Sequence, residues 1–129
     1  MNIKEYFKEH NGTGVLATAD DKGKVNSAIY AKPHFLEDGS LAFIMRDRLT
    51  RHNLTLNPSA SYLFIEKGEG YHGIRIHLEK IEESSDQTMI DALSRRTYAA
   101  DEKAEDRYLV TFKTEKVLTL IGGNEPSED

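Results

Sequence analysis

Three arginines gather where an apolar strand is predicted to run into a short helix. Arg46, Arg48 and Arg51 follow the apolar residues 41–45, and Asp47 is the single acidic residue among them. The whole chain has a formal net charge of -5, so this local excess of positive charge indicates an anionic ligand. A helix N-terminus adds unpaired backbone N–H groups and the positive end of the helix dipole. The junction therefore predicts a phosphate-binding site.

A structural interpretation of the same junction stays open at this stage. The Thr50 hydroxyl can donate to an anion, and His52 adds a further polar ring beside the arginines. Thr50 or Asp47 could equally be the N-cap of the helix. In that case the arginines would form a solvated face, as charged residues commonly do.

Other chemistries find little support in the residue pattern. The chain has five histidines, but His72 and His77 lie five positions apart on a predicted strand and so point to opposite faces. No HExxH pattern is present, so we expect no metal site, and no GxSxG or GxxxxGK[ST] pattern supports a hydrolase or a phosphate loop. Tyr71 and His77 could act as acid or base, or simply pack and form hydrogen bonds.

Composition bounds the class of protein. A length of 129 residues fits one domain, and the absence of cysteine excludes disulfides and thiolate nucleophiles. The N-terminus is charged and amphipathic, and no run approaches the roughly 20 apolar residues of a membrane span. The acidic balance argues against nucleic-acid binding. We therefore expect a cytoplasmic protein that binds neither membranes nor nucleic acid.

Apolar periodicity and turn residues divide the chain into short elements. We expect helices at residues 2–10, in the segment that ends at Asn57-Pro58, and at 87–96. About six strands are expected, from residues 14–19, 24–36, 41–45, 60–66, 71–83 and, as the last strand material, 108–112 and 117–121. Pro33 suggests an edge or a bend, 100–107 a charged linker, and 122–129 a flexible acidic tail.

Two features of this pattern favour an antiparallel barrel over a doubly wound sheet. Short turn sequences such as Asp38-Gly39 join successive strands, which is typical of hairpins. In residues 71–83, Ile74, Ile76 and Leu78 face one way while the polar residues between them face the other. Such strands bury one face and leave the other in solvent.

From Gly14 to about Ser85 the chain resembles the FMN-binding split-barrel proteins, the superfamily of pyridoxamine 5'-phosphate oxidase. The resemblance lies in the order of GVLATA, VNSAIYAKPHF, the DG hairpin, FIM, RDRLTRHNLTLNP, ASYLF and GYHGIRIHL. Its best short signature is NL followed by NP, at Asn53-Leu54 and Asn57-Pro58. The resemblance implies a mainly β (α+β) fold, a six-stranded antiparallel split β-barrel with short peripheral helices, over residues 1–121.

The resemblance also implies a homodimer with two FMN molecules at the subunit interface. The residues from Ser27 to Ile29 would run beside the isoalloxazine ring, and those from Ile44 to Arg46 would meet the ring edge and ribityl chain. The cofactor-binding residues that it implies, together with the arginines of the junction, are Ser27, Ala28, Ile29, Ile44, Met45, Arg46, Arg48, Leu49, Thr50, Arg51 and Arg75.

The chain departs from the family pattern at two positions of the implied site. Oxidases of this family usually place a lysine where Thr50 stands and an arginine near Ser27. The countercharge for the phosphate would then come from Arg46, Arg48 or Arg51. The C-terminal segment that completes the substrate site of the true oxidases is also missing, so pyridoxamine phosphate oxidation is not expected.

Three functional hypotheses follow from the sequence. The first is an FMN-dependent oxidoreductase that transfers electrons or hydride to a small-molecule substrate, with NADH or NADPH as a candidate donor. The second is a non-catalytic protein of the same fold that binds, stores or senses FMN or haem. The third is an interaction module without a ligand.

Overall fold

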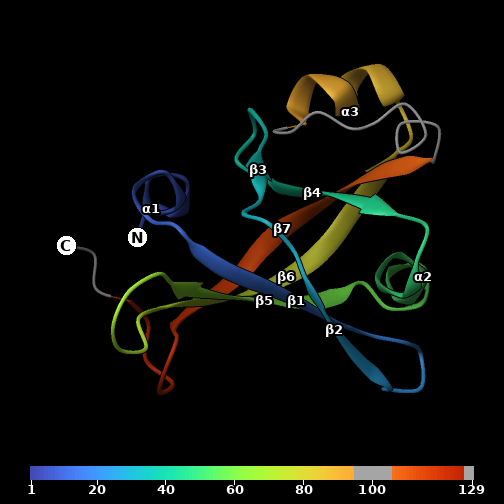
Figure 1. Cartoon of the computed structure of the whole chain (residues 1–129). Helices are drawn as coiled ribbons and strands as arrows, with labels where there is room; N and C mark the ends of the chain where they lie inside the picture. The colour runs from blue at the N-terminus through green and yellow to red at the C-terminus, as the bar shows by residue number, and fades with distance from the viewer. Residues whose placement is uncertain (95–105, 127–129) are drawn as a thin grey trace.

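The structure, a computed structural model, describes residues 1–94 and 106–126. As predicted, these residues form a mainly β fold: one antiparallel sheet with three short helices at its periphery (Figure 1). The strands are β1 (Gly12–Ala19), β2 (Val25–Ile29), β3 (His34–Phe35), β4 (Leu41–Arg46), β5 (Ser59–Glu66), β6 (Gly73–Ser84) and β7 (Arg107–Thr119). The helices are α1 (Ile3–Glu9), α2 (Leu49–Leu56) and α3 (Gln87–Leu93).

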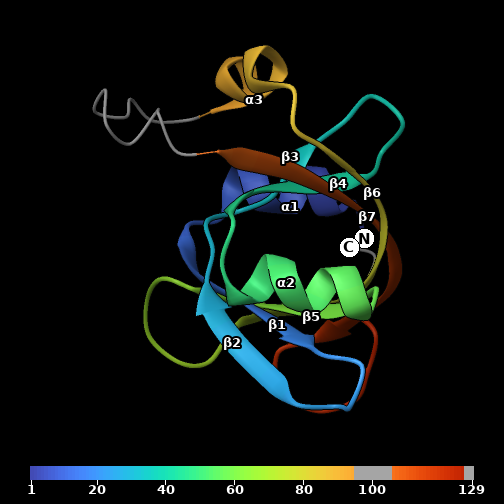
Figure 2. The ribbon, with the colours of Figure 1, turned by 90° about the vertical axis from the view of Figure 1, so that its right-hand side faces the viewer.

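The sheet curls around its core without closing. Its strands follow the order β2-β1-β5-β6-β7-β4-β3, so β2 and β3 are the two edges. The pairing of β6 with β7 shifts register between His77 and Leu78 and again between Lys80 and Glu82, and such irregularities bend a sheet. Figure 2 shows the resulting open curl, with α2 beside β1 and β2. Helix α3 lies beyond the edge of the sheet where β6 ends and β7 begins.

Three element boundaries differ from the sequence prediction. The single strand expected at residues 24–36 is wrong, because β2 ends at Ile29 and the two-residue β3 pairs separately with β4. The break contains Pro33, which was predicted to mark an edge or a bend and cannot donate to a ladder. The last strand material, expected in two pieces, is one continuous strand, β7. The sheet has seven strands instead of about six because the predicted strand 24–36 is divided into β2 and β3.

The third helix begins where the sequence predicts and ends earlier. The carboxylate of Asp86 accepts hydrogen bonds from the backbone N–H groups of Thr88 and Met89, so it caps α3 as expected. The helix ends at Leu93. Residues 95–96 of the predicted helix, 100–105 of the predicted linker and 127–129 of the predicted tail lie outside the described residues.

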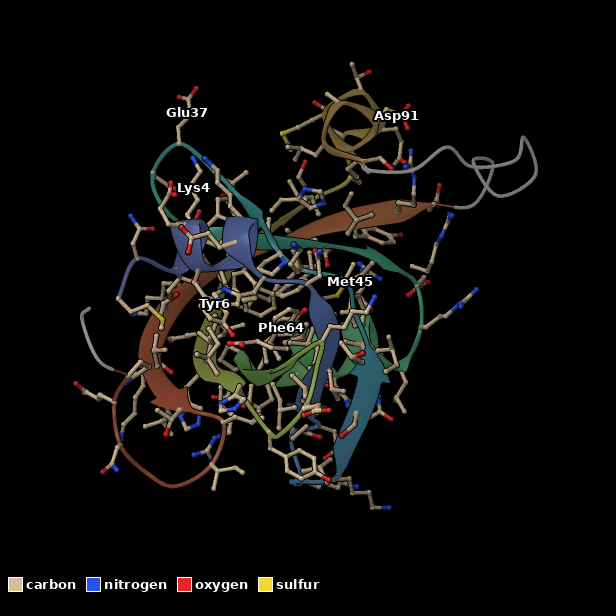
Figure 3. The ribbon with its side chains drawn as sticks, turned by 60° about the vertical axis from the view of Figure 1, so that its left-hand side comes forward. Lys4, Tyr6, Glu37, Met45, Phe64 and Asp91 are labelled. Atoms are coloured by element: carbon tan, nitrogen blue, oxygen red, sulfur yellow. The ribbon has the colours of Figure 1, made fainter. Side chains whose placement is uncertain are left out.

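The core is aromatic and lies inside the curl of the sheet. Phe43, Tyr62 and Phe64 are at most 2% exposed, and Phe7 of α1 packs edge-on against Phe64 with ring centroids 5.1 Å apart. The alternation predicted for β6 is confirmed, since Ile74, Ile76 and Leu78 are buried while the residues between them are more exposed. Figure 3 shows Phe64 and Met45 in this interior, with Tyr6 near it and Glu37 on an outer loop. In the described ranges, no helix is long and apolar enough to cross a membrane.

Candidate functional site

A cleft of about 790 Å³ lies at the split in the sheet, between the edge strand β2 and strand β4. Helix α2 borders it, since its first residues reach the same space. The cleft is lined by residues 12–14 of β1, 26–32 of β2 and the segment after it, His34 of β3, 43–46 of β4, 48–50 at the start of α2, and Ser94. Separate segments of the chain therefore meet around one cavity.

The cleft brings together most of the residues that the sequence placed in one site. All of the predicted cofactor-binding residues except Arg51 and Arg75 are among its lining residues. These lining residues come from β2, the end of β4 and the start of α2. They are Ser27, Ala28, Ile29, Ile44, Met45, Arg46, Arg48, Leu49 and Thr50. Their roles toward a ligand stay predictions.

The charge of the cleft is opposite to the charge of the chain. Lys32, Arg46 and Arg48 line it, whereas no aspartate or glutamate is among its described lining residues. The chain as a whole has a net charge of -5. Because a concave site focuses the field of the charges around it, the basic lining is compatible with the anion site that the sequence predicts.

The N-terminus of α2 opens into the cleft without a side-chain cap. Arg48 is the N-cap residue in an extended conformation, and no side chain forms a cap hydrogen bond there. The alternative in which Asp47 or Thr50 caps the helix is therefore wrong. No acidic residue lies in the first turn of α2. The first backbone N–H groups of the helix are thus available to an anion in the cleft.

Arg51 lies outside the cleft lining and ties α2 to the sheet. Its Nε donates to Glu83 Oε1 at 3.0 Å and its Nη2 to Glu83 Oε2 at 2.8 Å, while its Nη1 donates to Asp47 Oδ1 at 2.9 Å. Its guanidinium also stacks on the ring of Tyr108, 3.6 Å from the centroid. Two carboxylates already balance its charge, so this structure assigns it an anchoring contact instead of a cleft position.

The Arg51–Glu83 contact predicts a pH-dependent contribution to stability. The hydrogen bonds from Arg51 hold the pKa of the Glu83 carboxyl below its usual range, with Lys80 acting in the same direction and Asp47 opposing it. A lowered folded-state pKa stabilises the fold above the ordinary glutamate pKa, and this contribution is lost as the pH falls through the folded-state value. Glu83→Gln should therefore lower the free energy of unfolding by about 1–2 kcal/mol at pH 7. The difference from wild type should shrink as the pH falls below the ordinary glutamate pKa and through the folded-state value.

Urea unfolding at several pH values measures this difference. Glu79→Gln is the matched control, because its partner Lys113 has a side chain 60% exposed and such pairs contribute little. A Glu83→Gln deficit that is equally large at low and neutral pH would contradict the assignment.

Arg75, the other predicted binding residue outside the cleft, contacts the C-terminal segment. Its Nε donates to the Thr119 carbonyl at 3.0 Å, and its Nη2 donates to the Gly122 carbonyl. Tyr71, considered with it as part of a polar face, precedes β6 and is 75% exposed. Neither residue is among those that line the cleft.

Sequence reasoning missed the residues that follow β2. Tyr30, Lys32 and His34 line the cleft, because the chain leaves the sheet after Ile29 and bends around the opening. The Tyr30 hydroxyl is hydrogen-bonded to Thr50, and burial raises the pKa of this phenol. Lys32 Nζ donates to the carbonyls of Phe7 and His10, near the C-terminus of α1. Pro33 was the one sequence signal that could have indicated this bend.

The described residues contain no group of three or more histidine, aspartate or glutamate side chains that could hold a metal ion. The histidines and carboxylates that do meet form smaller contacts. His10, for example, stacks on Tyr6, whose hydroxyl donates to Glu66 at 2.6 Å.

No protein-family model matches the sequence, and no curated protein matches it. Solved structures do match the fold. An FMN-binding protein from Syntrophomonas wolfei superposes with a TM-score of 0.69 and 20% identity, over 90% of this chain and 82% of that chain.

Two further structures show the same architecture. A candidate pyridoxamine 5'-phosphate oxidase from Lactobacillus delbrueckii has a TM-score of 0.68 and 13% identity, with 92% of each chain covered. HutZ, the haem storage protein from Vibrio cholerae, has a TM-score of 0.61 and 20% identity, with 90% of each chain covered. The chain therefore has the split-barrel fold of the pyridoxamine 5'-phosphate oxidase-like proteins.

Proposed function

We propose that this protein binds FMN in the cleft, with the phosphate at the N-terminus of α2. One observation carries the proposal: Arg46 and Arg48 line a cleft that no described carboxylate lines, beside an uncapped helix N-terminus. A phosphate monoester requires such a combination of fixed positive charge and backbone N–H donors. The likeness of the fold to an FMN-binding protein supports the choice of FMN among phosphate ligands.

The rest of the cleft fits an aromatic ring system joined to a phosphate. Residues 27–29 of β2 and Ile44 and Met45 of β4 would border the isoalloxazine ring, and Thr50 would lie beside the phosphate. Bound FMN would supply one- and two-electron redox chemistry, and the chain would supply position, charge and exclusion of water. We propose an oxidoreductase that acts on a small substrate, with NADH or NADPH as the electron donor. No catalytic side chain is assigned.

The exposed face of β2 supports a homodimer with the cleft at its interface. Val25 is 83% exposed and Ile29 is 73% exposed, and both lie on the edge strand that borders the cleft. Leu49, at the start of α2, is also exposed. Apolar residues gathered on an edge strand beside a ligand site mark a surface that a second protein copy can cover.

Titration of the purified protein with FMN tests the proposal. We expect a shifted flavin absorbance, quenched flavin fluorescence, one FMN per chain, and a molar mass of two chains by light scattering. Riboflavin, which lacks the phosphate, is the control ligand and should bind at least about a hundredfold more weakly, since it forgoes several charge-assisted hydrogen bonds. No binding of FMN, or equal affinity for both flavins, would sink the proposal. Reduction of the bound FMN by NADH or NADPH separates an enzyme from an FMN storage or sensing protein.

Haem is the second candidate ligand, and His34 is the observation that favours it. This histidine is among the cleft-lining residues, and an imidazole is a common axial ligand of haem iron. The haem storage protein HutZ has the same fold. A Soret band that appears on adding haem and is lost in His34→Ala would support this alternative, whereas flavin bands without a Soret band would exclude it.

A further inference from the structure

The structure fixes Tyr30 in place from three directions. Its ring packs edge-on against Phe43, with centroids 5.9 Å apart and an interplanar angle of 81°. Its backbone N–H donates to the Gly14 carbonyl at 3.0 Å, and its carbonyl accepts from the Tyr62 hydroxyl at 3.0 Å. The position of the Tyr30 hydroxyl is therefore set before any ligand binds, and such preorganisation lowers the cost of binding.

The hydroxyl lies at the point of the cleft where the anion is expected. Tyr30 and Thr50 both line the cleft, and their hydroxyls are hydrogen-bonded to each other beside Arg48. Thr50 is only 4% exposed, so its hydroxyl is shielded from bulk solvent. Burial raises the pKa of the Tyr30 phenol, which keeps it protonated and a donor at neutral pH.

The hydroxyls of Tyr30 and Thr50 together have one proton left to donate to a ligand. Two hydroxyls carry two protons, and the hydrogen bond between them uses one. One proton remains for donation, and no carboxylate is among the described cleft-lining residues that could accept it. A phosphate oxygen held by the N-terminus of α2 is an acceptor of the right charge at that place.

We propose that Tyr30 is a binding residue that recognises the phosphate through the Tyr30–Thr50 hydroxyl pair. The inference rests on the proposed function, because it assigns a further residue to the same site. The pair supplies a neutral, directed donor beside the start of α2, and Arg46 and Arg48 supply the charge.

Tyr30→Phe tests the inference with little change in packing. We expect FMN affinity to fall about 3- to 10-fold, the contribution of one neutral hydrogen bond, while riboflavin affinity stays the same. The loss should be similar at about 0.05 M and about 0.5 M salt, because a neutral donor is not screened, whereas a loss caused by Arg48→Gln should shrink with salt. Thr50→Val should produce a similar loss, and the double variant Tyr30→Phe with Thr50→Val should lose less than the sum.

Tyr71→Phe is the matched control, since Tyr71 is exposed and does not line the cleft. If wild type binds FMN and Tyr30→Phe binds it equally well, the inference is wrong while the proposed function stands. If Tyr30→Phe lowers the affinity for FMN and for riboflavin equally, the hydroxyl only maintains the structure of the cleft, which also overturns the inference. If wild type binds no FMN, the proposed function itself fails.

Discussion

Replacing Arg46 and Arg48 together by glutamine should weaken FMN binding by about a hundredfold or more. Each guanidinium can give the phosphate a charge-assisted hydrogen bond of about 1.5–3 kcal/mol, and about 1.4 kcal/mol corresponds to a tenfold change in affinity. Both residues line the cleft, and no described lining residue is acidic. The affinity for riboflavin should change little, because riboflavin has no phosphate to lose. Fluorescence titration with both flavins measures the two constants.

The matched control is the double variant Lys113→Gln with Lys116→Gln. It removes the same net charge from exposed positions of β7, away from the cleft. FMN affinity in this control should stay close to that of wild type. If the control variant loses as much FMN affinity as the double arginine variant, the effect is one of net charge. The phosphate site at the start of α2 would then have to be abandoned.

Local patterns predicted the junction between β4 and α2, because its signals lie within a few residues. The apolar residues of β4, the arginines that follow and the Asn57-Pro58 stop are all neighbours in sequence. The buried and exposed faces of β6 could be predicted for the same reason. Alternation of apolar and polar residues is a local consequence of strand geometry.

The roles of the individual arginines could not be predicted, because their partners are distant in sequence. Arg51 pairs with Glu83, 32 positions away, and this contact depends on how α2 packs against the curled sheet. Arg75 reaches the Gly122 carbonyl only because β6 and β7 are paired and the chain then folds back. The charges at the junction indicated three equivalent candidates for the countercharge of the phosphate. Only the tertiary arrangement separates Arg51 from Arg46 and Arg48.

The end of β2 at Ile29 could not be predicted for a related reason. Residues 24–36 alternate well enough to predict one strand, yet β2 ends at Ile29. The chain turns there because the backbone of Tyr30 bonds to Gly14 and to the hydroxyl of Tyr62, which β5 contributes from within the core. A break that depends on the position of a distant side chain leaves little trace in the local sequence.

Gly14→Ala should strongly destabilise the wall of the cleft. An added Cβ would lie 1.8 Å from the Tyr62 hydroxyl oxygen and 2.6 Å from the Tyr30 carbonyl oxygen. Tyr62 is fully buried, so its ring has little room to retreat. We expect a loss of about 3 kcal/mol in the free energy of unfolding and a melting temperature lower by roughly 10 °C. Circular dichroism during heating and urea unfolding measure both quantities.

The same substitution should also weaken FMN binding, because Tyr62 and Gly14 together hold the backbone of Tyr30. Gly123→Ala is the control, since an added Cβ there meets nothing within 4 Å. Tyr62→Leu removes the hydroxyl that the new methyl group would strike. The double variant Gly14→Ala with Tyr62→Leu should therefore lose less stability than the sum of the single variants. Additive losses, or an unchanged melting temperature in Gly14→Ala, would show that the contact among these three residues does not shape the cleft.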